Sequence, residues 1–432
     1  MKFYDINNHN NIVSLQEAVI KSLSGTSGLY MPEFISSLPD SFFVALPDLS
    51  LQEIAFQVAS AMFGNDIPNH DLKQIVDEAL SFPIPLKQLD ENLFVLELFH
   101  GPTLAFKDVG ARFMAGLFQY FLRNQSKEVV ILVATSGDTG SAVANAFFNK
   151  KGVKVVILYP AGKVSGLQEK QLTTMGGNIL ALRVEGNFDD CQHLVKLAFA
   201  DKEINGKLNL TSANSINFAR LFPQSFFYFH ALSQLGKNTK PVVVSVPSGN
   251  LGNLTSGLIA KKMGLPVHKF IAATNLNRSL PDYLTSGNFK PQQTFHTISN
   301  AMDVGNPSNF PRILEIYRNQ HIEIASQIKG FSFDDLQNRS AMSELHDIYS
   351  YQADPHGALG YWGLKEYGLT GDEVGIFLET AHPAKFPYEV EKATKTQVAI
   401  PESLSVLADL PTQSLKISNS YDDLLQQLLK MA

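Results

Sequence analysis

The sequence predicts an α/β protein in which helices cover both faces of a mostly parallel β-sheet. One observation is that several runs, such as Val129–Val133 and Val242–Val246, are apolar at nearly every position instead of alternating with polar residues. The other is that segments of helical character, such as Ser141–Phe147 and Asn253–Met263, lie between these runs. Strands buried on both faces have no polar side, and parallel strands need long crossover connections, so both observations favour this fold class.

The remaining elements are predicted in chain order. Residues 14–80 are predicted to be helical, because Ser14 and Ser50 each precede an apolar segment and Glu17 and Glu53 follow them by three residues, as in a capping box. Further strands are predicted at Val153–Tyr159, Ile179–Val184, His268–Thr274 and Gly375–Glu379. Further helices are predicted at Gln168–Met175, Asp189–Ala200 and Asp422–Lys430, and the longest loop at Gly287–Ser308.

Composition narrows the class of protein. The chain has 432 residues and a net charge of −6, without a cluster of Lys and Arg, so nucleic acid is not an expected partner. Because Met1–Val13 lacks the pattern of a secretory signal and no apolar run is long enough to span a bilayer, we expect a cytoplasmic protein without a membrane partner. Cys191 is the only cysteine, which fits a reducing compartment. No histidine pair has metal-ligand spacing, so we predict no metal.

Lys107 is the strongest candidate for a catalytic residue. It lies in the segment HGPTLAFKD, residues 100–108, between apolar residues and an aspartate. Partial burial lowers the pKa of an amine and so favours the nucleophilic form that attacks an aldehyde to give a Schiff base. Taken alone, an ordinary surface lysine is the more common explanation of such a residue.

Three loops follow predicted strands directly, where ligands bind in parallel sheets. The segments Ser248–Asn253 and Thr135–Gly140 carry glycines and lead into helices, so that their N–H groups suit anions such as a phosphate and a carboxylate. A plain strand-to-helix turn, or helix capping by Asp138 or Thr139, explains the same residues. In the third segment, Glu379–Phe386, Thr380 offers a hydroxyl to a pyridine nitrogen. Pyridoxal phosphate is the one cofactor that uses all these groups together.

Four segments in this order resemble those of threonine synthases of the longer type found in many bacteria and fungi: HGPTLAFKD, SGDTG, SGNLGN and TAHPAKF. Further matches are the segments GLYMP, NSINFAR, AMDVGNPSNF and DPH, which extend the resemblance over nearly the whole chain. The sequence departs from the family at Leu251, where an aromatic residue is common, and at Gly357, where threonine is common.

The resemblance implies a fold-type II pyridoxal-phosphate enzyme, similar to the tryptophan synthase β subunit, with two open sheets and a helical N-terminal extension. It implies conversion of O-phospho-L-homoserine and water to L-threonine and phosphate, in which Lys107 forms the Schiff base and then acts as the base. The cofactor phosphate would bind Gly249, Asn250, Leu251, Gly252 and Asn253, and Thr380 would meet the ring nitrogen. For the substrate we assign Ser136, Gly137, Asp138 and Thr139 to the carboxylate, and Ser215, Asn217 and Arg220 to the phosphate.

The resemblance also implies how the chain is organised. We predict a helical domain at 1–90, an α/β domain with the lysine at 91–235, an α/β cofactor domain at 236–400 and a C-terminal tail at 401–432. The longer type suggests a monomer. Two alternatives are open: another fold-type II lyase, such as a threonine or serine dehydratase, or a non-catalytic homologue that binds the cofactor.

Overall fold

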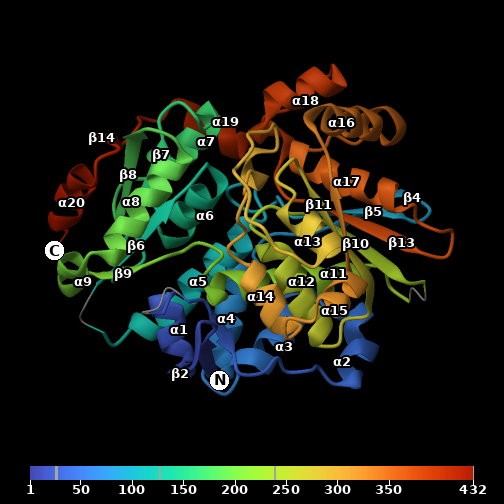
Figure 1. The fold of residues 1–432 in the computed structure, drawn as a ribbon, viewed down its shortest axis with the longest axis horizontal. Helices are drawn as coiled ribbons and strands as arrows, with labels where there is room; N and C mark the ends of the chain where they lie inside the picture. Colours follow the sequence, from blue (N-terminus) through green and yellow to red (C-terminus); the bar gives the residue numbers. More distant parts are fainter. Residues whose placement is uncertain (25–27, 126–127, 238–239, 432) are drawn as a thin grey trace. The chain divides into compact units, whose positions relative to one another are not determined.

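The computed structural model describes residues 1–24, 28–125, 128–237 and 240–431, and the chain forms two compact units (Figure 1). Unit 1 contains Met1, Met31–Phe106 and Leu221–Ala399, and unit 2 contains Lys2–Tyr30, Lys107–Arg220 and Ile400–Ala432. Each unit has an open sheet of its own, which confirms the predicted fold class. These two units group the chain differently from the four predicted domains, which stay a prediction.

The sheet of unit 2 has five strands in the order β14-β8-β7-β6-β9, and all of its neighbouring strands run parallel. The strands are β6 (Val129–Ala134), β7 (Val153–Pro160), β8 (Ile179–Glu185), β9 (Asn209–Thr211) and β14 (Ser414–Ser418). The helices are α1 (Leu15–Lys21), α5 (Lys107–Leu122), α6 (Asp138–Phe147), α7 (Gly166–Thr173), α8 (Phe188–Ala200), α9 (Lys202–Lys207), α19 (Glu402–Ala408) and α20 (Tyr421–Leu429), with α10 (Phe218–Leu221) at the boundary.

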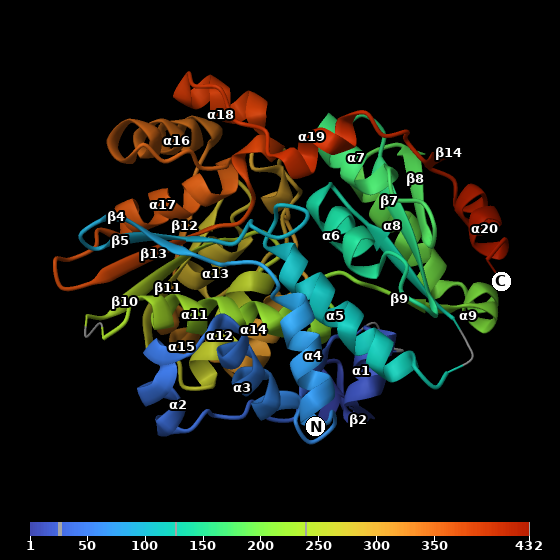
Figure 2. The ribbon, with the colours of Figure 1, turned by 180° about the vertical axis from the view of Figure 1, so that it is seen from behind.

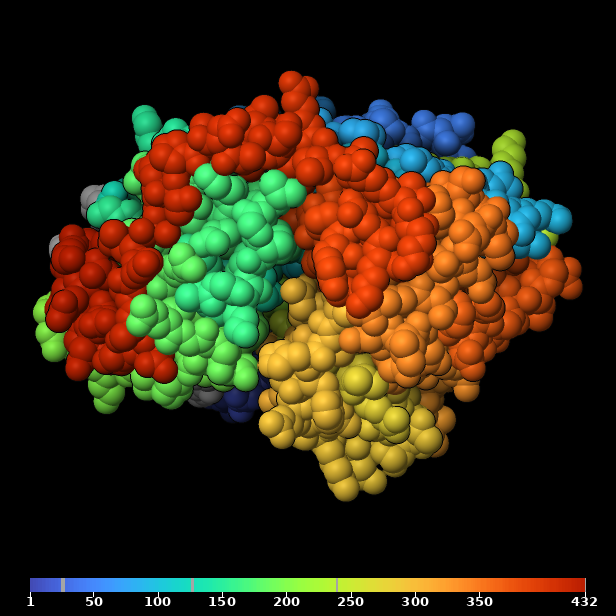
Figure 3. Space-filling view, turned by 90° about the horizontal axis from the view of Figure 1, so that it is seen from above, coloured from blue at the N-terminus to red at the C-terminus, as the bar shows by residue number. Residues whose placement is uncertain are grey.

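Helices cover both faces of this sheet, which explains why its strands are apolar throughout. On one face, Leu132 and Leu158 pack in a core with side chains of α8 and α20, among them Cys191 and Leu424. The burial of the Cys191 thiol raises its pKa to about 12. On the other face, Gly140 of α6 lies so close to the Ile157 side chain that an added Cβ would be 3.1 Å from it. Figure 3 shows the C-terminal residues, in red, beside the green residues of the same unit.

The sheet of unit 1 has six strands in the order β12-β11-β10-β13-β5-β4, parallel except for the antiparallel edge strand β4. The strands are β4 (Leu86–Asp90), β5 (Leu93–Glu97), β10 (Val242–Pro247), β11 (Val267–Thr274), β12 (Ile328–Ser332) and β13 (Val374–Glu379). The α-helices are α2 (Asp40–Ala45), α3 (Leu51–Phe63), α4 (Asn69–Ala79), α11 (Ser225–Gln234), α12 (Gly252–Lys262), α13 (Ser279–Ser286), α14 (Phe310–Ile316), α15 (His321–Gln327), α16 (Asp335–Tyr349), α17 (Pro355–Tyr367) and α18 (Pro387–Thr394).

Two helices pack directly on opposite faces of this sheet, and glycines allow the close approach. Gly363 of α17 faces Ile271 and Ala273 of β11, whereas Gly257 of α12 faces Phe270 of the same strand. Because neighbouring side chains of a strand point to opposite faces, α17 and α12 lie on opposite sides (Figures 1 and 2). Within the described ranges, no helix is both apolar enough and long enough to cross a membrane.

The first residues and the last residues form more structure than predicted. The strands β1 (Lys2–Asp5) and β2 (Asn8–Ser14) pair antiparallel ahead of the predicted helices, and β3 (Tyr30–Pro32) follows α1. At the other end, α19 and β14 precede the one helix that was predicted, and β14 extends the sheet beside β8. The predicted capping box of Ser50 and Glu53 is confirmed at the start of α3. At the start of α1, the Ser14 hydroxyl accepts the Glu17 N–H, but the Glu17 carboxylate accepts from Lys21, so the second predicted box is only half formed.

Candidate active site

The three predicted ligand loops all follow the carboxyl ends of strands. In unit 2, Thr135–Gly140 connects β6 to α6. In unit 1, Ser248–Asn253 connects β10 to α12, and Glu379–Phe386 follows β13. Since β10 and β13 are parallel neighbours, these two loops of unit 1 emerge at the same edge of the sheet.

Lys107 is the first residue of α5, and its side chain is 16% exposed. Its Nζ donates a hydrogen bond to the Asp138 Oδ2 in the loop after β6, at 3.3 Å. Within unit 1, Phe106, the residue before the lysine in the sequence, donates its N–H to the Thr380 carbonyl at 2.9 Å.

A second contact that was not predicted holds the Asp138 carboxylate. Gln168, from α7, donates from Nε2 to Asp138 Oδ1 at 2.8 Å and is buried. Asp138 does not cap α6: the N-cap is Gly137, with a φ of 142°, and the Thr135 hydroxyl accepts the N–H groups of Gly137 and Gly140 at 3.0 and 2.9 Å. The carboxylate of Asp138 is therefore directed to the lysine amine and the glutamine amide.

The residues proposed for the substrate phosphate are mostly buried in unit 2. Asn217 donates from Nδ2 to the Val19 carbonyl at 2.8 Å and to the Ser22 hydroxyl at 2.6 Å, so its amide holds the N-terminal segment. Arg220 is 3% exposed and donates to the Ala213 carbonyl. Burial lowers the pKa of Arg220 to about 10, although the charge of Asp108 acts in the opposite direction. Ser215 is half-buried in the turn before them.

The loop Ser248–Asn253 has the geometry of an anion site. Leu251, the N-cap of α12, is left-handed with a φ of 61°, and a Cβ on Gly249 would lie 2.6 Å from the Met302 Cα. Asn253 is buried, and its Nδ2 has no hydrogen-bond partner among the described residues, whereas the Tyr228 hydroxyl donates to its carbonyl oxygen at 2.9 Å. A buried donor at a helix N-terminus favours a negatively charged ligand.

Residues from α14 and the turn before it hold this loop from behind. The Ser308 N–H donates to Asn250 Oδ1 at 2.6 Å, and Asn309 Nδ2 donates to the Asn250 carbonyl at 3.1 Å. Arg312, which is completely buried, donates to Asn309 Oδ1 at 2.7 Å. Burial lowers the pKa of Arg312 to about 9.

Thr380 follows a strand end that is rich in buried acids. Glu379 Oε1 accepts the N–H of Asp354, and burial, together with the charge of Asp354, raises the pKa of Glu379. Glu97, at the end of the neighbouring strand, contacts His100 and Lys87. Burial acts to raise the pKa of Glu97, but its hydrogen bonds to His100 and Lys87 outweigh that effect and lower it.

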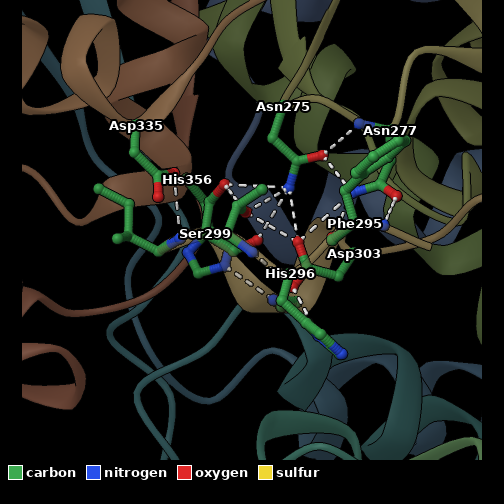
Figure 4. A network of polar contacts seen from close by, with 11 residues as sticks. Asn275, Asn277, Phe295, His296, Ser299, Asp303, Asp335 and His356 are labelled. Carbon is green, nitrogen blue, oxygen red and sulfur yellow. Dashed lines mark hydrogen bonds and ion pairs between the residues drawn. The ribbon is translucent and has the colours of Figure 1, made fainter.

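A polar network holds the long loop between α13 and α14 at the carboxyl end of β11 (Figure 4). Asp303 Oδ1 accepts from Asn275 Nδ2 at 2.9 Å and from the Thr297 hydroxyl at 2.7 Å, and Asp303 Oδ2 accepts the Thr297 N–H. Burial raises the pKa of Asp303 to about 6, although the hydrogen bonds from Thr297 act to lower it. The network therefore fixes a loop that the sequence predicts only as irregular.

Comparison with known proteins identifies the family to which this chain belongs. A model described as "Pyridoxal-phosphate dependent enzyme" matches residues 79–378, and models described as "Threonine synthase N terminus" and "Threonine synthase, C-terminal" match residues 2–80 and 358–428. The threonine synthase of Serratia marcescens is 43% identical over 99% of each chain. The chain belongs to the threonine synthase family.

Solved structures support this membership over the full length. The crystal structure of threonine synthase from Escherichia coli is 43% identical, covers 100% of both chains and has a TM-score of 0.94. The PLP-bound threonine synthase from Brucella melitensis is 34% identical, covers 99% of this chain and 98% of its own, and has a TM-score of 0.93. Membership of the threonine synthase family gives the chain its cofactor, pyridoxal phosphate, and its activity, that of a lyase of threonine biosynthesis.

Proposed function

We propose that this threonine synthase converts O-phospho-L-homoserine and water to L-threonine and phosphate, with Lys107 as the catalytic lysine. One observation supports the assignment of the lysine: its side chain is largely buried, and its amine is hydrogen-bonded to Asp138 in the loop after β6. A buried amine beside a carboxylate is oriented for proton transfer, which is the role that this reaction requires of the lysine.

The loop Gly249–Asn253 fits the phosphate group of the cofactor. Glycine at position 249 leaves the backbone against Met302, where no Cβ could be placed, and the Nδ2 of Asn253 is a buried donor without a partner in the described part of the chain. The N-terminus of α12 adds positive partial charge. In the neighbouring loop, the Thr380 hydroxyl is our candidate partner for the ring nitrogen.

The residues of the chain have separate tasks in this reaction. When bound, pyridoxal phosphate supplies an electron-withdrawing ring that stabilises negative charge on the α carbon of an amino acid. Lys107 Nζ takes the α proton of the substrate and returns it at the end of the reaction, while Asp138 and Gln168 orient the amine. Exclusion of water until the phosphate has left requires that the site close over the substrate.

We assign the two anionic groups of the substrate to unit 2. The Asp138 carboxylate faces Lys107, so the substrate carboxylate is assigned to the hydroxyls of Ser136 and Thr139 and to the backbone around Gly137. The substrate phosphate is assigned to Ser215, Asn217 and Arg220. Because the Asn217 amide is occupied by Val19 and Ser22, its contribution is to fix the turn in front of Arg220.

Incubation with O-phospho-L-homoserine tests the substrate. We expect equal amounts of L-threonine and inorganic phosphate, measured by chromatography and by a phosphate assay. Release of ammonia from L-threonine or L-serine, without phosphate release, would favour a dehydratase instead. A protein that binds the cofactor and releases neither product would favour the non-catalytic alternative.

Replacing Arg220 with alanine tests the phosphate assignment. A charge-assisted hydrogen bond contributes about 1.5–3 kcal/mol, so we expect the KM for O-phospho-L-homoserine to rise about 10- to 100-fold. The absorption spectrum of the bound cofactor should be unchanged. Arg220→Lys is the control, because it keeps the charge without the two-pronged geometry and should lie between the two proteins. An unchanged KM in a variant that retains its thermal midpoint would refute the assignment.

We also propose that the enzyme is a monomer of the cytoplasm. The buried position of its single cysteine agrees with a reducing compartment. Gel filtration with light scattering tests the monomer.

A further inference from the structure

Asp354 and His356, at the start of α17, form a buried pair that the mechanism does not use. Asp354 is completely buried and His356 is 3% exposed. The Nδ1 of His356 lies 2.6 Å from Asp354 Oδ1, and its Nε2 accepts the N–H of Ala301 at 3.2 Å. With Nε2 as an acceptor, Nδ1 is the ring nitrogen that donates to Asp354.

The aspartate of this pair holds the segment that carries Thr380. Asp354 Oδ2 accepts the N–H of Ala381 at 3.0 Å, and the N–H of Asp354 donates to Glu379 Oε1. Both residues that flank Thr380 are thus bonded to Asp354. Asp354 therefore restrains the segment that carries Thr380.

The histidine of the pair holds the backbone on which the phosphate loop rests. Ala301, bonded to His356, immediately precedes Met302, and both residues pack against Gly249: a Cβ on Gly249 would lie 2.6 Å from the Met302 Cα and 3.2 Å from the Ala301 oxygen. Figure 4 shows His356 reaching toward the segment of Ser299 and Asp303. Hydrogen bonds to Asp303 hold this segment at the end of β11, and the bond from Ala301 to His356 connects the same segment to α17.

We propose that Asp354 and His356 are positioning residues. Together they connect the segment of Thr380, the candidate partner of the cofactor ring nitrogen, to the backbone of Ala301 and Met302, on which the phosphate loop rests. The Nε2 of His356 is the acceptor that makes this connection. The inference rests on the proposed assignment of Gly249–Asn253 to the cofactor phosphate. It predicts that loss of the Nε2 acceptor weakens binding of the phosphate group and leaves binding of the rest of the cofactor unchanged.

Two substitutions of similar size separate the contacts of the ring. An asparagine side chain reaches about as far as Nδ1, so His356→Asn keeps a donor for Asp354 and loses the acceptor for Ala301. A glutamine side chain is one methylene longer and reaches about as far as Nε2, so His356→Gln keeps an acceptor for Ala301. A role confined to the contact with Asp354 would make asparagine the better replacement.

The experiment measures dissociation constants for pyridoxal phosphate and for pyridoxal, which lacks the phosphate, after the cofactor has been removed from each purified variant. Loss of one hydrogen bond corresponds to about a three- to tenfold change in affinity. In His356→Asn we expect this loss of affinity for pyridoxal phosphate but not for pyridoxal, and a shifted phosphorus NMR signal of the bound phosphate. In His356→Gln we expect the affinity for pyridoxal phosphate to lie within about twofold of the parent.

Gly249→Ala is the control, because its added Cβ would clash directly with the backbone of Ala301 and Met302. If Gly249→Ala leaves the ratio of the two affinities unchanged, the loop does not hold the phosphate, and both assignments fail. If Gly249→Ala changes the ratio and His356→Asn does not, the positioning role alone is overturned. Equal weakening of both ligands in His356→Asn, or better binding by asparagine than by glutamine, would also overturn it.

Discussion

Lys107→Ala should lose turnover of O-phospho-L-homoserine by about a thousandfold or more, since a positioned general base alone contributes about 10²- to 10⁴-fold. The lysine has two tasks, attachment to the cofactor aldehyde and transfer of the α proton, and alanine can perform neither. Steady-state release of phosphate measures the loss. The absorption of the bound cofactor and the mass of the protein after borohydride reduction report on the attachment.

Lys107→Arg distinguishes the need for a reactive amine from the need for a positive charge at position 107. The guanidinium keeps a positive charge for Asp138, 3.3 Å from Nζ in the parent, but it stays protonated at any pH that the protein tolerates. We therefore expect Lys107→Arg to be as inactive as Lys107→Ala while it is closer to the parent in thermal stability. Turnover within tenfold of the parent in either variant, or a cofactor adduct on a peptide without residue 107, would contradict the assignment of the lysine.

Gly357→Thr should destabilise unit 1 by about 1–3 kcal/mol or more, the usual cost of overpacking a core. The family resemblance leads us to expect threonine at this position. A Cβ on Gly357 would lie 1.7 Å from Glu379 Oε2, inside the buried carboxyl group. The side chain of Glu379 occupies the space that a larger residue at position 357 would need, so it would have to leave its bond to Asp354.

A double-mutant cycle with Glu379→Ala tests this explanation. Removal of the carboxyl opens the space, so the further cost of Gly357→Thr should fall below about 1 kcal/mol in the Glu379→Ala background. Trp362 is the only tryptophan and lies in α17 with Gly357, so its fluorescence during urea unfolding reports on this part of unit 1. Equal costs in both backgrounds would show that the two positions do not compete for space.

The fold could be predicted, and the candidate site could be proposed, because their signals are local. Lys107 stands in a distinctive segment, and each ligand loop follows an apolar strand within a few residues, so neighbouring residues suffice to recognise them. In contrast, Gln168 lies 30 residues from the carboxylate that it holds, and Asn309 lies 59 residues from Asn250. An ordinary amide side chain carries no sign of such a partner until the fold brings the two together.

Two of the strands that the sequence did not predict, β14 and β2, lack an apolar run. β14 lies beside β8 at the edge of its sheet, with Ile417 as its one buried residue, and β2 is largely polar. Edge strands expose one side to water and need few apolar residues, so a search for buried strands overlooks them. The role of Asp354 and His356 was missed for another reason: their segment was recognised, but the backbone groups of Ala381 and Ala301 that they bond come from distant parts of the chain.

The use of both chain ends in unit 2 sets the order in which a ribosome can complete the two units. The segments of unit 1 end at Ala399, whereas unit 2 waits for Ile400–Ala432, which bring β14 and the core residues Leu424 and Leu428. During synthesis, every segment of unit 1 has therefore been made while unit 2 is still incomplete and exposes apolar surface. A chain truncated before α20 should therefore leave a translation product that chaperones retain, because Leu424 and Leu428 of α20 complete the core of unit 2.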